Sequence, residues 1–166
     1  MADSLKYATI ETDLGWVGVA LSAGGLRAVE LPLPSRIEAI ERMAELGAHE
    51  PASDEELGEI PVAVRALVAG RPAHGALFDW TGITPFRRAV LEECARIPPG
   101  ETRSYGWLAE QVGHPRAARA VGRVMATNPW PLFVPCHRVV GSDGSLHGYG
   151  GGLPMKDALL RAEGAR

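Results

Sequence analysis

The sequence predicts an α+β protein with a small antiparallel sheet and helices in its first half and a mostly helical second half. Short apolar segments separated by turn residues occur only in the first half. Helix caps and apolar stripes with helical spacing fill the second half. The charge also changes sign, because residues 1–78 carry 6 Lys and Arg against 12 Asp and Glu, whereas residues 79–166 carry 11 against 8. We therefore expect two domains, 1–78 and 79–166.

The composition excludes several classes of protein. Of the 166 residues, 46% are hydrophobic and 22% are charged, which is usual for a globular chain and unlike a disordered one. No apolar run approaches the ~20 residues that a membrane-spanning helix needs. Met1–Ile10 lacks the apolar region of a signal peptide. We expect a soluble, cytoplasmic protein with no membrane partner.

The first domain is predicted to begin with three strands in an antiparallel meander. The candidate strands are Tyr7–Ile10, Trp16–Leu21 and Leu26–Leu31, separated by turns that contain glycine. Ser35 and Glu38 have the spacing of a capping box, which predicts a helix that ends near Leu46.

The remainder of the first half carries weaker signals. The acidic stretch His49–Glu59 is predicted to be a loop. Pro61 is expected to begin a short helix that ends near Gly70. Arg71–Gly75 reads as a linker, since the charge balance changes sign just after it.

The second half is predicted to contain four helices. Thr84 and Pro85 form a helix start, and Pro98–Gly100 ends that helix after an apolar stripe of Phe86, Val90, Leu91, Cys94 and Ile97. The other three helices are expected at about Tyr105–Val112, Pro115–Thr127 and Pro154–Glu163. The second and third are separated by a short turn, as in a helix-turn-helix, in which the later helix enters a nucleic-acid groove.

The predicted helix from Pro115 carries a basic face. Arg116, Arg119 and Arg123 fall within about 60° of one another on a helical wheel. A separate face holds the apolar residues Ala117, Val121, Val124 and Met125, and the remaining surface is thin because it consists of Ala118, Ala120 and Gly122. This pattern favours a polyanion as partner, and the alternative is a solvated face of an ordinary amphipathic helix.

The two cysteines differ in their surroundings. They are too few for a disulfide framework or a four-cysteine metal site. Cys94 lies in an apolar stripe and is expected to be structural. Cys136 is followed by His137 and Arg138, and nearby positive charge lowers the pKa of a thiol from its free value of ~8.5. In an extended chain His137 would point away from Cys136, so a proton relay between them would need a bridging water.

A glycine-rich segment follows the second cysteine. Gly141–Gly152 contains six glycines in twelve residues. It lacks the Gly-Lys-Ser/Thr ending of a phosphate-binding loop, so it is a weak nucleotide-binding signal.

Pro135-Cys136-His137-Arg138-Val139 resembles the active-site signature of the O6-alkylguanine-DNA alkyltransferases, the methylated-DNA–protein-cysteine methyltransferases. Further blocks occur in the family's order and spacing: Ser104-Tyr105-Gly106, Leu108-Ala109, Ala118-Arg119-Ala120-Val121-Gly122, Asn128-Pro129, Gly148-Tyr149 and Leu159-Leu160 with Glu163-Gly164. The resemblance runs from Thr84 to Gly164. It implies a ribonuclease-H-like first domain and a winged-helix-like, helix-turn-helix second domain.

The resemblance also implies an activity. Members of this family repair DNA by direct reversal, and the alkyl group of O6-alkylguanine in double-stranded DNA would move irreversibly to Cys136 after base flipping. O4-alkylthymine is a second candidate substrate. The thioether product would consume the protein, one alkyl group per molecule. No cofactor and no metal are implied, since the zinc site of some members needs cysteines that the first half lacks. We expect a monomer, with cooperative assembly on DNA left open.

The resemblance assigns catalytic roles to five residues. Cys136 is the alkyl acceptor, His137 acts through a water as its base, and Glu163 orients His137. Asn128 ties the backbone of the recognition helix to the active-site loop. Tyr105 crowds the phosphate that rotates during base flipping, and its hydroxyl can donate a proton toward the guanine ring.

The family pattern also implies binding residues. Arg119 is the finger that replaces the flipped nucleotide, and the other DNA-binding residues are Ser104, Arg116, Ala118, Gly122 and Arg123. The implied pocket residues are Met125, Pro131, Val139, His147, Tyr149 and Gly150. His147 stands where many relatives have a small residue or Thr, and we expect it to narrow the pocket against large O6 substituents.

Three other functions remain as alternatives. A helix-turn-helix regulator would explain the Arg face, but it gives no reason for Pro135–Arg138. A lesion-binding relative without transfer activity would have another residue in place of Cys136. A cysteine hydrolase would need an oxyanion-donor motif, which the sequence does not show.

Overall fold

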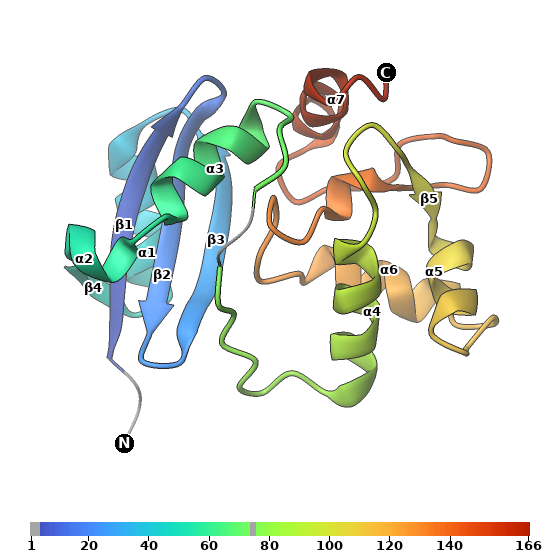
Figure 1. Cartoon of the computed structure of the whole chain (residues 1–166), viewed down its shortest axis with the longest axis horizontal. Helices are drawn as coiled ribbons and strands as arrows, with labels where there is room; N and C mark the ends of the chain where they lie inside the picture. Colours follow the sequence, from blue (N-terminus) through green and yellow to red (C-terminus); the bar gives the residue numbers. More distant parts are fainter. Residues whose placement is uncertain (1–3, 74–75) are drawn as a thin grey trace. The chain divides into compact units, whose positions relative to one another are not determined.

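The structure, a computed structural model, describes residues 4–73 and 76–166 and divides into two compact units, Met1–Thr81 and Gly82–Arg166 (Figure 1). The first unit holds a sheet with helices and the second is mostly helical, so the α+β prediction is confirmed. Residues 74 and 75 of the expected linker lie outside the described residues. Within the described ranges, every helix is too short or too polar to span a membrane.

The first unit is built on a four-stranded sheet in the order β3-β2-β1-β4. The predicted antiparallel meander is confirmed, and its strands are β1 (Leu5–Thr12), β2 (Gly15–Ser22) and β3 (Gly25–Leu33). In β2, Val17 and Val19 point to one face and Ala20 to the other, and all three are fully buried. The sheet is therefore covered on both sides.

Two helices provide this cover. The predicted capping box begins α1 (Arg36–Glu45), since Ser35 Oγ accepts from Glu38 N and Glu38 Oε2 accepts from Ser35 N, both at 3.2 Å. Met43 of α1 packs with Ala20 behind the sheet, and α3 (Ile60–Val68) crosses the near face (Figure 1). The Pro61 signal for this helix is confirmed.

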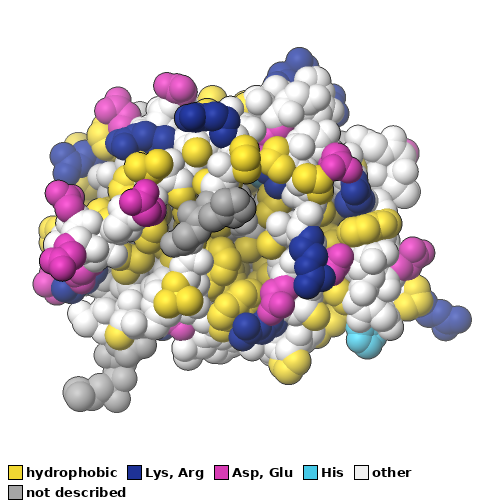
Figure 2. Space-filling view, viewed as in Figure 1, with side chains coloured by type: hydrophobic (Ala, Val, Ile, Leu, Met, Phe, Trp, Pro, Cys, Tyr) yellow, Lys and Arg dark blue, Asp and Glu magenta, His cyan; other side chains and the backbone are white. Residues whose placement is uncertain are grey.

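The prediction of a loop over His49–Glu59 is wrong. The segment contains β4 (Ala48–Pro51), which pairs in parallel with β1, and α2 (Asp54–Leu57). A second capping box, between Ser53 and Glu56, begins α2, and acidic side chains gather over this helix (Figure 2). Both elements are largely exposed, so they lack the apolar pattern by which sequence analysis finds structure.

The second unit agrees with most of the predicted helices. Thr84 caps the first of them by accepting from Arg87 N at 3.3 Å, and Val90, Leu91 and Cys94 of its apolar stripe are fully buried. The helices are α4 (Pro85–Ala95), α5 (Tyr105–Gln111), α6 (Ala118–Ala126) and α7 (Leu153–Ala162).

The predicted start of α6 at Pro115 is wrong by three residues. Ala117 N donates to His114 O at 2.9 Å, and this turn delays the helix until Ala118. Arg116 therefore precedes the helix, and the predicted basic face is reduced to Arg119 and Arg123. The opposite face is buried as expected, through Val121, Val124 and Met125.

A short parallel ladder that sequence analysis does not predict positions the key segments of the second unit. It joins β5 (Arg103–Ser104) to β6 (Val139–Val140), with Arg103 opposite Val139 and Ser104 opposite Val140. Strand β6 directly follows the 3₁₀ turn η1 (Cys136–Arg138), and β5 leads into α5. The ladder thus brings the beginning of α5 beside the Cys136 turn.

The segment at the end of the first unit, residues 77–79, is hydrogen-bonded to β3. Leu26 N donates to Leu77 O at 2.7 Å, and Asp79 N donates to Leu26 O at 2.9 Å. The Asp79 side chain is 5% exposed and accepts from Ser22 Oγ at 2.5 Å, Thr81 N at 3.0 Å and Arg27 Nε at 2.9 Å. These hydrogen bonds hold the pKa of Asp79 well below its usual range.

We expect Asp79→Asn to lower the free energy of unfolding of the first unit by about 2–3 kcal/mol, because it removes a buried, charged acceptor. The pKa of Asp79 is lower in the folded state than in the unfolded chain, where it is ~3.9. The contribution of Asp79 to the free energy of unfolding is therefore fully present above this unfolded pKa and is lost as the pH falls below it toward the folded-state pKa. Urea unfolding between neutral and acidic pH measures both effects. The exposed Asp13→Asn is the matched control and should change the free energy by less than about 0.5 kcal/mol. Equal effects of the two substitutions would contradict the account.

Candidate active site

Cys136 lines a cavity of about 260 Å³ in the second unit, although the residue is only 6% exposed. The cavity is formed by the start of α5, one side of α6, the Cys136 turn and the glycine-rich segment that follows. Its lining residues are Tyr105, Gly122, Met125, Ala126, Cys136, Gly148, Tyr149 and Gly150.

A second cavity of about 440 Å³ adjoins the first and is more open to solvent. The two share Tyr105, Gly122, Ala126 and Gly148, and the outer one adds Ala118, Arg119 and His147. Arg119 is exposed on α6. A path of shared lining residues therefore connects the buried cysteine with the arginine-bearing surface.

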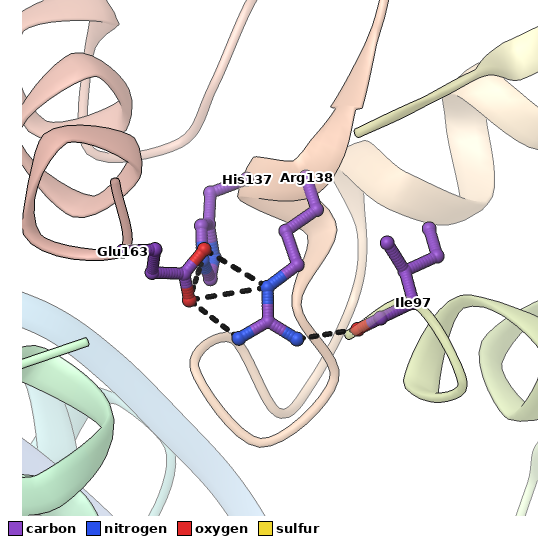
Figure 3. Close-up of polar contacts among 4 residues, drawn as sticks. All are labelled: Ile97, His137, Arg138 and Glu163. Atoms are coloured by element: carbon purple, nitrogen blue, oxygen red, sulfur yellow. Dashed lines mark hydrogen bonds and ion pairs between the residues drawn. The ribbon is translucent and has the colours of Figure 1, made fainter. Parts of the chain in front are cut away.

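The side chains of His137, Arg138 and Glu163 meet in a buried cluster (Figure 3), and the first two directly follow Cys136 in the chain. His137 Nε2 lies 3.1 Å from Glu163 Oε2, and Arg138 Nε lies 3.0 Å from Glu163 Oε1. Arg138 Nη2 also bonds Glu163 Oε2, and Arg138 Nη1 donates to Ile97 O at 2.5 Å. The His137 and Glu163 side chains are each 2% exposed. The family resemblance implies that Glu163 lies beside His137, and the structure places the two side chains within hydrogen-bonding distance.

The contacts of Glu163 fix its ionisation. Burial raises the pKa of its carboxyl group, but the hydrogen bonds and the charges of His137 and Arg138 together leave the pKa below its usual value. The ionised carboxylate has no proton to donate. His137 Nε2 must therefore carry the hydrogen of their hydrogen bond, which assigns the tautomer of the imidazole.

The other ring nitrogen of His137 is left as an acceptor. Burial is the largest influence on the pKa of His137 and lowers it, and the positive charges of Arg138 and Lys156 act in the same direction. Together they leave the pKa below its usual value, although the hydrogen bond and charge of Glu163 raise it. The imidazole is therefore neutral at pH 7. Its Nδ1 atom is buried and has no hydrogen-bond partner among the described residues. A buried polar atom of this kind is ordinarily paired with a water molecule.

The expectation that neighbouring positive charge dominates the ionisation of Cys136 is not met. Burial raises the pKa of the thiol, while a hydrogen bond from Asn128 and the charge of Lys156 oppose that rise. Arg138 faces Glu163 instead of the sulfur. The chain at Cys136 is also a 3₁₀ turn and not extended, and because successive side chains lie about 120° apart there, His137 still points away from the sulfur.

Asn128 connects the end of α6 to the segment that leads into Cys136. Its Nδ2 atom donates to Val134 O and its Oδ1 atom accepts from Trp130 N, both at 2.9 Å. Between these two anchors, the buried Leu132 has a φ of 78°, a conformation that is rare for residues other than glycine. The Asn128 bonds hold this segment in place, as the predicted role requires.

Lys156 is a site residue that the sequence analysis does not identify. It is fully buried on α7, and its Nζ atom donates to Val139 O at 2.7 Å and His147 O at 3.2 Å. The same atom lies 5.9 Å from the ring centre of Tyr105 and 6.0 Å from that of Tyr149. A sequence signal does exist, because positions 156, 159, 160 and 163 share one helical face and the two between are leucines.

The two tyrosines keep their protons near neutral pH. Burial raises the pKa of Tyr105 and of Tyr149, and the nearby Cys136 adds to both shifts. Tyr105 lies edge-on to His147 at a ring-centre distance of 6.0 Å. The Tyr149 hydroxyl is close enough to the sulfur to affect its pKa but completes no hydrogen bond of good geometry with any described residue. Both hydroxyls are therefore potential donors.

Four predicted pocket residues lie where expected. Met125, Tyr149 and Gly150 line the inner cavity, and His147 lines the outer one. Pro131 and Val139 are not among the residues that line either cavity, and their assignment to the pocket stays a prediction. Pro131 is buried and pairs with Val134 before the Cys136 turn. Val139 is buried in β6, where its carbonyl accepts from Lys156.

The predicted DNA-binding residues divide into three groups. Ala118, Arg119 and Gly122 line the outer cavity. Ser104 caps α5 by accepting from Trp107 N at 3.0 Å, which leaves its hydroxyl hydrogen available. Arg116 and Arg123 are both exposed, and Arg123 borders a separate apolar groove with Phe86 and Val124.

A metal site is not found in the described part of the chain, since it contains no group of three or more His, Cys, Asp or Glu that could hold an ion.

Comparisons with known proteins place this chain in one family. The sequence model described as "6-O-methylguanine DNA methyltransferase, DNA binding domain" matches residues 85–165. A methylated-DNA–protein-cysteine methyltransferase of Shigella flexneri is 52% identical over 84 residues, and that of Mycobacterium leprae is 56% identical over 80. These alignments cover 51% and 48% of this chain, respectively. They cover 49% and 48% of the two relatives, so the chain spans about half the length of the curated relatives that it matches.

Solved structures extend the similarity to most of the chain. The crystal structure of Mycobacterium tuberculosis O6-methylguanine methyltransferase matches with a TM-score of 0.78 and 35% identity, over 98% of this chain and 94% of that one. The O6-methylguanine-DNA methyltransferase of Pyrococcus kodakaraensis matches with a TM-score of 0.75 and 25% identity, over 96% and 99%. The chain belongs to the O6-alkylguanine-DNA alkyltransferase family.

We expect Lys156→Met to raise the pKa of Cys136 relative to the wild type, because the substitution removes a positive charge that favours the thiolate. Iodoacetamide should then modify Cys136 more slowly at a given pH, since the thiolate is the reacting form. Lys6, the only other lysine, is paired with Glu56 on the surface of the first unit, and Lys6→Met is the matched control. An unchanged pH dependence in Lys156→Met would contradict the assigned electrostatic role.

Proposed function

We propose that this protein repairs DNA by transferring the alkyl group of O6-alkylguanine to the Cys136 sulfur. The observation that carries the proposal is the pair of adjoining cavities that connects Cys136 with Arg119 on α6. The names of the curated relatives and the solved structure of Mycobacterium tuberculosis OGT in complex with DNA support it. O4-alkylthymine is a second candidate substrate.

The second unit provides the proposed DNA-binding surface. Helix α6 would enter the minor groove, because Ala118 and Gly122 keep its outer surface thin enough for close approach to the duplex. Extruding a base costs a few kcal/mol of lost stacking, and an inserted Arg119 would fill the vacated space. Ser104, Arg116 and Arg123 complete this surface, whose phosphate contacts would not depend on sequence.

The chemistry follows from the positions of the proton donors and acceptors. A water between Cys136 and His137 Nδ1 would carry the thiol proton to the imidazole, whose new charge Glu163 stabilises through Nε2. The sulfur then attacks the alkyl carbon in line with the bond to O6, and a carbon–sulfur bond replaces the carbon–oxygen bond. The bonding electrons leave with the guanine, and the Tyr105 hydroxyl would donate a proton or hydrogen bond to its ring.

The product determines how the protein is used. A thioether is stable, and among the described residues that line the inner cavity there is no second thiol that could take the alkyl group from the sulfur. Each molecule would therefore act once and need no cofactor. We further propose that the protein works as a cytoplasmic monomer, that residues 1–78 have a structural role, and that His147 at the outer cavity limits the size of the alkyl group.

We expect the protein to gain one methyl group when it is incubated with a duplex that contains O6-methylguanine. Mass spectrometry of the digested protein should place the methyl group on the Cys136 peptide, because Cys94 is fully buried. Cys136→Ser should bind the duplex and remain unmodified. Lesion binding by the wild type without modification would instead favour a non-transferring DNA-binding protein, and slow ester hydrolysis would favour a cysteine hydrolase.

We expect Arg119→Ala to weaken binding to lesion-containing DNA about tenfold, because the flipped state loses the side chain that fills its place. The matched control is Arg166→Ala, since Arg166 is exposed near the chain end and pairs with Asp157. Fluorescence anisotropy at several salt concentrations measures both variants, and affinity should fall steeply with salt for all of them. Equal losses for the two variants would contradict the role of Arg119.

A further inference from the structure

Arg138 is a buried cation that the proposed reaction does not yet use. Its side chain is 6% exposed and lies on the turn that also carries Cys136 and His137. All of its guanidinium nitrogens are engaged with protein acceptors. Since a buried cation is expensive unless it is fully paired, its acceptors indicate what it does.

The acceptors of Arg138 belong to two helix ends. Nε contacts both carboxylate oxygens of Glu163, at 3.0 and 3.1 Å, and Nη2 donates to Oε2 (Figure 3). The guanidinium therefore binds the carboxylate in a bidentate manner. Nη1 reaches the carbonyl of Ile97, just beyond the end of α4. A Cβ atom at Gly100 would lie 3.3 Å from Glu163 O, which shows that the turn after α4 packs on the end of α7. Arg138 thus holds the same carboxylate that His137 contacts.

We propose that Arg138 is a positioning residue that neutralises Glu163 and thereby keeps His137 an uncharged proton acceptor toward Cys136. This inference rests on the proposed alkyl transfer, in which His137 must accept a proton at Nδ1. It assigns to Arg138 a role in the reaction beyond holding the fold together.

The reason lies in the charge balance of the buried cluster. The titratable groups that influence His137 are Arg138 on η1, Lys156 on α7 and Glu163 at the end of α7, and Cys136, Cys94 and Tyr149 extend the same buried cluster. Only Glu163 is an anion at neutral pH. With Arg138 absent, the buried carboxylate would draw a proton onto His137 as its direct counter-ion. An imidazolium carries hydrogens on both nitrogens and cannot accept the thiol proton.

With Arg138 present, its guanidinium is the counter-ion of the Glu163 carboxylate. His137 is then free to donate from Nε2 and to remain unprotonated at Nδ1. The burial of His137 and the positive charge of Arg138 both act in this direction on the pKa of its imidazole. The same bidentate contact also prevents the carboxylate from rotating away from His137.

The test is a titration of His137 in the full-length protein by nitrogen NMR of labelled histidine, whose two ring shifts report the tautomer and the charge. The chain has five histidines, and His137→Gln identifies the signal. In the wild type we expect a neutral ring with the hydrogen on Nε2 at pH 7. Arg138→Met should shift the titration of His137 to higher pH and slow methyl transfer at pH 7 about tenfold. Arg138→Lys keeps the charge and should restore both toward the wild type.

Two further variants complete the design. Arg138→Gln removes the charge but keeps a hydrogen-bond donor, and it replaces Arg138→Met if that variant does not fold. Arg161→Met removes an exposed arginine that pairs with Asp157 on the same helix as Glu163, and it should leave His137 and the transfer rate unchanged.

The outcomes separate the inference from the function on which it rests. If folded variants without the Arg138 charge show the wild-type titration and tautomer of His137, the inference is overturned, whatever their transfer rates. If the wild type itself transfers no methyl group from O6-methylguanine DNA, the proposed function fails. If the folded variants without the Arg138 charge titrate His137 at a higher pH than the wild type and transfer the methyl group more slowly, the result supports both the inference and the proposed function.

Discussion

The carboxylate of Glu163 is the point on which the arrangement of this site depends. It is an ionised group removed from water, a situation that costs several kcal/mol unless close partners compensate. His137 and Arg138 are those partners, and they are consecutive residues of one 3₁₀ turn. Once both side chains are directed at the end of α7, the side chain before them, Cys136, is left to face the cavity on the other side of the turn.

Two further sets of hydrogen bonds position the side chains that line this cavity. The β5–β6 ladder sets Tyr105 beside the turn, and Asn128 fixes the strained segment that precedes Cys136. Lys156 then ties the glycine-rich segment to β6 through two backbone carbonyls, and its charge favours the thiolate. A thiol and two phenol donors thus line a space that leads to Arg119, and the neutral base lies on the other side of the Cys136 turn. Such a set suits a single proton transfer coupled to alkyl transfer.

Local signals in the sequence were enough for most of the fold and failed where the structure depends on distant contacts. The capping box at Ser35 and the Thr84-Pro85 start predict α1 and α4, because a cap is satisfied by residues three positions away. Strand β4 and the β5–β6 ladder form only against partners far along the chain, and their short sequences carry no apolar pattern. The family motif names Cys136, His137 and Glu163, whereas burial, which governs the pKa of the thiol and the role of Lys156, is a property of the folded chain alone.

The central claim is that His137, held by the Glu163 carboxylate, removes the proton of Cys136 during alkyl transfer. Glu163→Gln tests it most directly, since the amide keeps the size of the side chain and an acceptor for Arg138 but not the negative charge. The measurement is the single-turnover rate of methyl transfer from an O6-methylguanine duplex at saturating protein, beside the affinity for the same duplex. The account predicts unchanged affinity and a rate lower by about a hundredfold. An unchanged rate in the folded variant would contradict it.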